Sequence, residues 1–296
     1  MSSFRVTERS VASRVLTGLQ YNLDRLGRTQ QQLSSGKQIN GASDSPTGAV
    51  AAMQFRSDIS AAQQQRRNAD DGIGWLGSAD AALTNVSSSG RRARELVLQG
   101  MSAGTGGSAE SREALAAEID NIRKELIGTA NTTYLNRPVF GGTTGGTVAY
   151  DQSGTYVGDT GTVTRTVGEN MKVRVDTGGE EVFGTGDTQL FKVLDDITTH
   201  LRTNPAALGD DLGRLDTALQ KVQAGLSSVG ARYNQVDRMR QAADDKVLDL
   251  KNQLSDVEDI DLPKTLTDLS LQQTAYQAAL AAAARVVQPS LVDFLR

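Results

Sequence analysis

The stretch LSSGKQINGASDSPTGAVAAM, residues 33–53, decides how this chain is organised. A strongly helical N-terminal segment runs into Gly36, Gly41 and Pro46, and a helical pattern then resumes. Glycine weakens a helix and proline cannot continue one. The sequence therefore predicts a polar break between two helices, and the rest of the chain has to explain why a break is needed there.

Composition limits the kind of fold and partner. The chain has 296 residues, only 4% of them aromatic, and a mean hydropathy of -0.36. Such a chain lacks the bulky side chains of a thick globular core, so thin, elongated packing is expected. The net charge of -4 and the mixing of Lys and Arg with Asp and Glu provide no basic patch, which argues against nucleic acid as a partner.

Export and membrane signals are weak. The start, MSSFRVTERS, carries Arg5, Glu8 and Arg9 where a cleavable signal needs an apolar core. The most apolar run, residues 275–287, is mostly alanine and contains Arg285, so no membrane span is expected. The absence of cysteine excludes disulfides, thiolate zinc sites and thiol nucleophiles.

The strongest periodicity lies near the C-terminus. Alternating steps of four and three residues select an almost wholly apolar stripe: Leu208, Leu212, Leu215, Leu219, Val222, Leu226, Val229, Tyr233, Val236, Arg240, Ala243, Val247, Leu250, Leu254 and Val257. A continuous helix here would be about 75 Å long at roughly 1.5 Å per residue. Gly225 and Gly230 inside it each cost about 1 kcal/mol relative to alanine, so packing must support this helix.

Two thinner stripes occupy the chain ends. The N-terminal one reads Leu16, Leu19, Leu23, Leu26, Gln30 and Leu33, and the C-terminal one reads Leu262, Leu266, Leu269, Gln273, Tyr276, Leu280, Ala283 and Val287. Pro263 suits the first turn of the second helix and Pro289 its end. These seams bury little by themselves, so we expect other copies of the chain to complete them.

The middle of the chain supplies further helices and a small β region. Ala52, Phe55, Ile59, Ala62, Arg66, Ala69, Ile73, Leu76, Asp80 and Leu83 keep a seven-residue register, and Leu115, Ile119, Ile122 and Leu126 mark a shorter helix. Residues 139–188 are rich in Gly and Thr, and the alternating runs 162–167 and 171–175 predict β-hairpins. Asn204 before Pro205 predicts a further helix start.

The expected fold is mainly α. A long antiparallel helical rod or coiled coil is formed by the N- and C-terminal halves and carries a small central β-rich insert. We expect three domains: a terminal coiled coil of residues 1–40 and 260–296, a helical rod of residues 41–138 and 189–259, and the insert of residues 139–188.

The glycine motifs do not indicate a nucleotide site. Gly72, Gly74 and Gly77 satisfy G-x-G-x-x-G, but the preceding residues QQQRRNADD are polar and in helical register instead of forming a buried strand. Close helix packing explains them better. GGTTGGT lacks the Lys and Ser or Thr of a P-loop.

No catalytic or metal-binding set is visible in the sequence. His200 is the single histidine, and one imidazole cannot build an ordinary zinc site, so a solvated or capping role is expected. The acids Asp256, Glu258, Asp259 and Asp261 lack calcium-loop spacing and favour a helix terminus. We therefore expect no enzyme activity, no cofactor and no metal.

Several segments together resemble one family. LSSGKQINGASDSPTGA is similar to the LSSGxRI…SDDP segment of the flagellin superfamily, and QRRNADDGIGWLGSADAALTNV and the segment from REALAAEIDNI to FGGT resemble its outgoing helices and first β-turn. VGARYNQVD and the stretch from LSDVEDIDLPK to the end resemble its returning arm. Ser45 replaces the second Asp of SDDP, and LNRPVFGG replaces a GRYLFSG-like stretch.

The resemblance implies an assembly role. Terminal helices would pair in an inner layer, and residues 36–46 would link them to an outer rod whose first helix has Ser45 as cap and Pro46 as first residue. The short insert resembles the hook-filament junction branch, which implies an exported, extracellular adaptor of the bacterial flagellum. The implied assembly residues are Leu16, Leu19, Leu23, Leu26, Leu33, Leu262, Leu266, Leu269, Tyr276, Leu280, Val287, Leu291, Phe294 and Leu295.

The implied partners are a ring of like subunits, hook-associated protein 1, flagellin and a flagellar export chaperone, without nucleic acid or membrane. Export would follow the flagellar type III route without a cleavable signal. Two alternatives remain: a flagellin that forms the bulk filament, and a cytoplasmic coiled-coil signalling adaptor.

Overall fold

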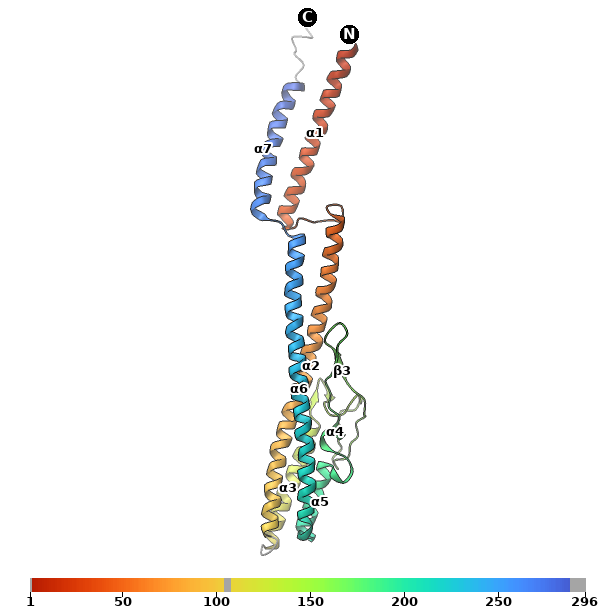
Figure 1. Ribbon diagram of the computed structural model, residues 1–296, viewed down its shortest axis with the longest axis vertical. Helices are drawn as coiled ribbons and strands as arrows, with labels where there is room; N and C mark the ends of the chain where they lie inside the picture. The colour runs from red at the N-terminus through yellow and green to blue at the C-terminus, as the bar shows by residue number, and fades with distance from the viewer. Residues whose placement is uncertain (1, 104–107, 288–296) are drawn as a thin grey trace. The chain divides into compact units, whose positions relative to one another are not determined.

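The computed structural model describes residues 2–103 and 108–287 (Figure 1). Its elements are α1 (Ser2–Ser35), α2 (Pro46–Ala103), α3 (Ala109–Ala130), β1 (Thr133–Tyr134), β2 (Arg137–Pro138), β3 (Thr164–Thr166), β4 (Lys172–Arg174), α4 (Gly179–Phe183), α5 (Leu190–Thr203), α6 (Leu208–Glu258) and α7 (Leu262–Val287), with 3-10 turns at Gly186–Thr188 and Pro205–Ala207. The prediction of a mainly α fold with a small β insert is confirmed. No helix among the described residues is long and apolar enough to cross a membrane.

The chain forms two compact units. One comprises Met1–Ser60 and Val247–Arg296, and the other Ala61–Lys246. These limits differ in position from the domain boundaries expected after residues 40 and 259, and α2 and α6 each contribute residues to both units.

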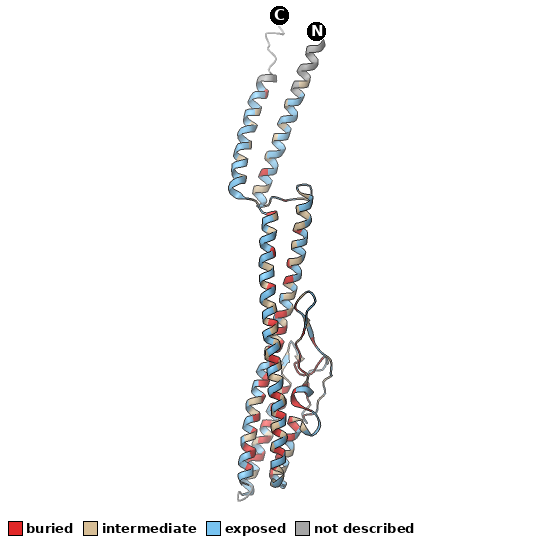
Figure 2. Ribbon diagram, in the orientation of Figure 1, coloured by how far each residue is buried: buried red, intermediate tan, exposed pale blue. Residues whose placement is uncertain are grey.

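Helix α6 contains the predicted long stripe, and its burial repeats every seven residues (Figure 2). The buried apolar side chains seven residues apart are Leu208, Leu215, Val222, Val229, Val236, Ala243 and Leu250, and Ala218, Asp211 and Glu258 are buried in addition. The salt bridges Arg66–Asp244 (3.3 Å) and Arg94–Asp216 (2.6 Å) show that α2 and α6 run antiparallel. One position of each seven-residue repeat is thus buried along α6, and the second stripe position is partly buried at Leu212, Leu219 and Leu226. The two positions together form a coiled-coil-like seam.

The unit formed by Ala61–Lys246 contains several shorter elements besides its parts of α2 and α6. Helix α3, predicted from its spacing, packs against α5, which was not predicted from the sequence. Phe140, Tyr150, Phe183 and Phe191 form an aromatic cluster with ring centroids 4.9 to 5.5 Å apart. Aromatic rings are few in this chain, and four of them gather here to fill the thickest part of the core.

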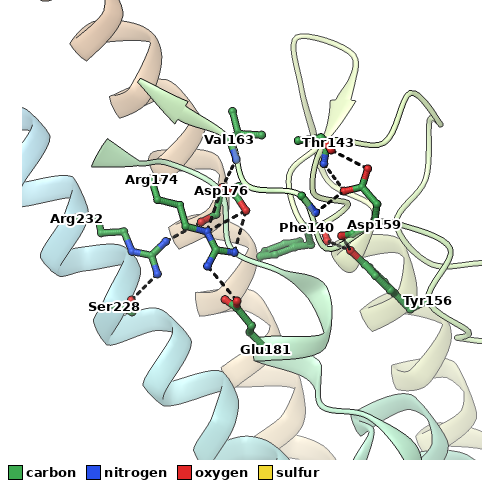
Figure 3. Close-up of polar contacts among 11 residues, drawn as sticks. Phe140, Thr143, Tyr156, Asp159, Val163, Arg174, Asp176, Glu181, Ser228 and Arg232 are labelled. Carbon is green, nitrogen blue, oxygen red and sulfur yellow. Dashed lines mark hydrogen bonds and ion pairs between the residues drawn. The ribbon is translucent and has the colours of Figure 1, made fainter. Parts of the chain in front are cut away.

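The β insert contains one predicted hairpin. Strands β3 and β4 pair antiparallel with Arg165 opposite Val173, within the runs expected from alternation. The buried carboxylate of Asp176 accepts hydrogen bonds from the Val163 N–H and from Arg174, and the Arg232 guanidinium of α6 donates to the Asp176 backbone oxygen at 2.7 Å (Figure 3). The Asp176 backbone therefore fastens the insert to α6, while its side chain holds residues of the insert to one another.

Candidate assembly interface

Helices α1 and α7 lie side by side and run in opposite directions (Figure 1). The Ile260 N–H donates to the Gly36 backbone oxygen at 3.1 Å, which ties the end of α1 to the start of α7. Further along, the Thr29 hydroxyl donates to the Gln272 side-chain oxygen at 3.0 Å. The pair therefore forms within one chain.

The seam between these two helices is only partly buried. Its faces are Val15, Leu19, Asn22, Leu26, Thr29 and Leu33 on α1, and Thr265, Leu269, Gln272, Tyr276, Ala279 and Ala283 on α7. Among the described side chains of both helices, only Thr29 and Ala283 are buried. Half of these twelve residues are small or polar and the larger ones are only half-buried, so pairing within the chain removes little apolar surface from water.

The predicted assembly residues divide between this seam and a neighbouring face. Leu19, Leu26, Leu33, Leu269 and Tyr276 lie half-buried on the seam. The exposed set is Leu16, Leu23, Leu262, Leu266 and Leu280, with Leu16 59% and Leu262 54% exposed. The Val287 side chain and residues Leu291, Phe294 and Leu295 lie outside the described part of the chain.

Sequence reasoning missed part of both faces. It did not select Val15, Thr29 or Gln272, because the register with the most leucines skips the seam positions occupied by polar residues. It also missed Tyr21 and Leu271, which are 61% and 68% exposed. A search for two adjacent registers per helix, instead of the single most apolar one, would have found the seam positions. Tyr21 and Leu271 lie about 140° around their helices from Leu16 and Leu266, outside both registers.

The link between α1 and α2 has a defined structure. Gly36 adopts φ +72, a left-handed conformation that ends α1 and favours glycine. The Ser45 hydroxyl accepts a hydrogen bond from the Gly48 N–H at 3.1 Å, and Pro46 is the first residue of α2, as predicted. Asp44 accepts from the backbone N–H groups of Asn40 and Gly41, both at 3.0 Å. The polar residues of the break thus satisfy its backbone.

Glu258, at the end of α6, connects the link to two helices. Its carboxylate is 7% exposed and accepts hydrogen bonds from Lys37 Nζ at 3.0 Å and from Arg56 of α2. Its backbone oxygen accepts the Gln38 N–H at 2.6 Å. Glu258 is the last residue of α6, so the expectation of a helix terminus that favours negative charge is wrong for this acid. Asp261 meets it, because its carboxylate accepts the Lys264 N–H in the first turn of α7. No local pattern predicts that Glu258 is buried between two cations.

A hollow of about 310 Å³ opens beside these charges. Ile39, Ala49, Ala52 and Met53 line its apolar wall, and Lys37 and Arg56 lie at its charged side. Met53 is 59% exposed, whereas Ile39 and Ala52 are buried. All of these residues belong to the unit that contains α1 and α7.

The other sites considered in the sequence have structural explanations. Gly72, Gly74 and Gly77 lie inside the continuous helix α2, where Val175 packs against Gly72 and Tyr134 covers Gly74, so close packing is confirmed for these two. It is wrong for Gly77, where a Cβ would meet nothing within 4 Å. His200 lies in the last turn of α5 with Nδ1 2.6 Å from the buried Asp211 carboxylate, instead of being solvated. Within residues 2–103 and 108–287, no group of three or more His, Cys, Asp or Glu side chains could hold a metal ion.

Known proteins resemble the chain along most of its length. Flagellar hook-associated protein 3 of Escherichia coli is 26% identical over 275 residues, which cover 84% of this chain and 86% of that protein. A flagellin of Bacillus subtilis is 25% identical over 304 residues, 96% of each chain. A putative flagellar hook-associated protein from Vibrio parahaemolyticus shares the fold with a TM-score of 0.67 at 20% identity, over 73% of this chain and all of that one.

Two family models match the two halves of the helical framework. The bacterial flagellin N-terminal helical region matches residues 6–142, and the bacterial flagellin C-terminal helical region matches residues 212–295. The matched regions contain α1, α2 and α3 on one side and most of α6 with α7 on the other, while the β3–β4 hairpin lies between them. The chain belongs to the bacterial flagellin superfamily.

Proposed function

We propose that this chain is a noncatalytic structural adaptor that joins the hook side of a bacterial flagellum to its flagellin filament. The observation that carries the proposal is the exposure of leucines along the terminal helices. Leu16, Leu23, Leu262 and Leu266 are each more than half exposed although they recur at helical spacing. Each leucine gains about 1.5 to 3 kcal/mol when it is fully buried, so neighbouring subunits have a large apolar surface to cover.

The terminal helices, residues 1–40 and 260–296, act in this proposal as the assembly domain, and residues 41–138 and 189–259 as the rod that carries the insert. Neighbours are copies of the same chain in a ring, hook-associated protein 1 on the hook side and flagellin on the filament side. The name of the Escherichia coli relative supports this position. Export proceeds through the flagellar type III route with a chaperone, and a chain without cysteine has no disulfide to obstruct threading.

Flagellin is the second candidate, because the Bacillus subtilis flagellin matches 96% of this chain at a nearly equal identity. The two functions differ in where the protein lies. An adaptor occupies a short zone at the hook end, whereas a flagellin fills the whole filament.

Labelling the protein on intact flagella tests the proposal. The chain has no cysteine, so a single Leu135→Cys variant, at a site 73% exposed on the β1–β2 turn, accepts a thiol-reactive gold or fluorescent label. We expect one labelled zone where hook meets filament. Label along the whole filament would establish the flagellin alternative, and label retained inside cells of a motile strain would contradict both.

A further inference from the structure

The hollow beside Glu258 has the properties of a docking site. Its wall is apolar, with Met53 more than half exposed, and its charged side carries Lys37 and Arg56 around the single carboxylate of Glu258. Among the residues that line the hollow, two cations and one anion leave one positive charge in excess. The ligand that fits is therefore a short apolar segment with one carboxylate among its side chains.

The sequence contains such a segment. Residues 291–295 read Leu-Val-Asp-Phe-Leu, so Asp293 lies between apolar residues on both sides. The other end of the chain is a poorer match, because Arg5 and Arg9 would meet Lys37 and Arg56. Charge complementarity thus selects the segment around Asp293.

The segment cannot reach the hollow of its own chain. The hollow lies beside Glu258, just before α7 begins, and α7 then runs for 26 residues. At roughly 1.5 Å per residue the helix carries Val287 about 38 Å away. Phe294 lies seven residues further along, and seven fully extended residues span at most about 25 Å. An occupant with this sequence must therefore come from a second copy.

We propose that residues 291–295 of one copy dock into the Ile39–Met53–Arg56 hollow of a neighbouring copy. Phe294 and its apolar neighbours cover Ile39 and Met53, and the Asp293 carboxylate pairs with Arg56 and Lys37. This contact rests on the proposed function, because it requires copies assembled through their terminal helices. It assigns a role to the break between α1 and α2, which builds the receiving surface for the next subunit.

Thiol cross-linking between full-length chains tests this contact. Cells produce two single variants together, Met53→Cys and Phe294→Cys, and a mild oxidant is added to their sheared flagella. Since the natural chain has no thiol, the expected product is a covalent species of two chains whose linked peptides contain positions 53 and 294. The matched control replaces Met53→Cys by Leu135→Cys, which is more exposed but lies on the other unit, and should give no such species.

The outcomes separate the contact from the proposed function. If both cysteine variants reach the hook end but no 53–294 species forms, the docking inference is overturned and the adaptor function stands. The docking inference is likewise overturned if Phe294→Cys links to flagellin or to hook-associated protein 1 instead. If the protein is absent from the flagellum, the proposed function itself fails.

Two charge variants test the contact without introducing cysteines, which could themselves disturb assembly. Asp293→Glu should assemble like the natural chain, because it keeps the carboxylate, whereas Asp293→Lys should lose assembly because it places a third cation beside Arg56 and Lys37. Equal incorporation of both variants into flagella would overturn the assigned pairing.

Discussion

Single residues hold the ends of the helices together, and Glu258 is the clearest case. Its carboxylate is nearly buried, yet its partners Lys37 and Arg56 are 40% and 52% exposed. Water can therefore solvate both cations when the acid is lost, which limits the cost. The acid nevertheless joins three segments that are distant in sequence.

Glu258→Ala should destabilise this junction by about 1 to 3 kcal/mol, because two charge-assisted hydrogen bonds are lost at a nearly buried site. Amide hydrogen exchange at Gln38 and Ile260 measures the effect locally. Glu95→Ala, which removes an exposed acid paired with Arg92 at 3.7 Å, is the control and should leave those amides unchanged. Unchanged exchange in Glu258→Ala would show that the ion pairs do not stabilise the link.

Two glycines of α6 form a matched pair for stability. A Cβ at Gly230 would meet nothing within 4 Å, whereas a Cβ at Gly225 would lie 2.8 Å from Val182 of α4. Gly230→Ala should raise the free energy of unfolding by about 0.5 to 1 kcal/mol through helix propensity. Gly225→Ala should lower it, since overpacking costs about 1 to 3 kcal/mol. Denaturant unfolding of both variants measures the two changes in the free energy of unfolding. Equal changes would refute the close packing of Gly225 against Val182.

The β insert should lose stability at acid pH because the Asp159 carboxylate becomes protonated. The Thr143 N–H, 2.6 Å from the carboxylate, and the Thr143 hydroxyl hold the pKa of Asp159 below its ordinary value. A carboxylate with a lowered pKa contributes stability above its unfolded pKa of about 3.9, and this contribution is lost as pH falls through the folded value. Asp159→Asn should therefore increase exchange of the Thr143 amide near neutral pH but not at the acid end. A constant difference at every pH would contradict this assignment.

At the scale of elements, α1 presents two faces with different tasks. Leu19 lies half-buried on the seam with α7, while Leu16 is exposed beside it. Leu19→Asn should destabilise the pairing of α1 with α7 by about 1 kcal/mol, since it removes a half-buried leucine. Leu16→Asn should leave exchange protection in α1 unchanged but reduce incorporation into flagella. If both variants lost protection equally, the two faces would not be distinct.

The same helices show how far a sequence pattern can predict structure. In α6 every second member of the apolar stripe is buried and most of the others are partly buried, so the bounds and the seam of this helix were predictable. In α1 the partner is α7, and the seam between them includes polar positions such as Asn22 and Thr29. The register with the most leucines therefore lies partly on another face of α1. Helix α5 is not among the helices predicted from periodicity, although Phe191, Leu194 and Ile197 carry a helical spacing.

Contacts between distant segments were the least predictable part of the candidate site. The hollow combines residues 37–56 with Glu258, and no local pattern links an acid at the end of one helix to Lys37 and Arg56. The break itself, its N-cap at Ser45 and its polar character were readable from turn and capping chemistry. The hollow beside the break is completed by Glu258, which follows some two hundred residues later in the chain, so the sequence pattern of the break does not predict it.

For the whole molecule, the two units predict separable folding and assembly. The unit Ala61–Lys246 contains the aromatic cluster and most of the buried residues of α6. A chain lacking residues 1–40 and 260–296 should therefore unfold cooperatively and remain helical by circular dichroism, yet be absent from flagella and leave cells non-motile. Motile cells carrying this truncation would refute the assembly role of the terminal helices, and an unfolded product would refute their independence.

Burial at every seventh residue of α6 limits the lengths that α6 and the facing part of α2 can have. From Leu208 to Leu250 the inward positions recur at a constant interval. Removing seven residues from α6 and seven from the facing part of α2 would realign every inward side chain while shortening both helices by about 10 Å. Removing five would rotate the side chains that follow by about 140° and turn them toward solvent. Natural relatives in which α2 and α6 are shorter or longer are thus expected to differ by multiples of seven residues in each helix.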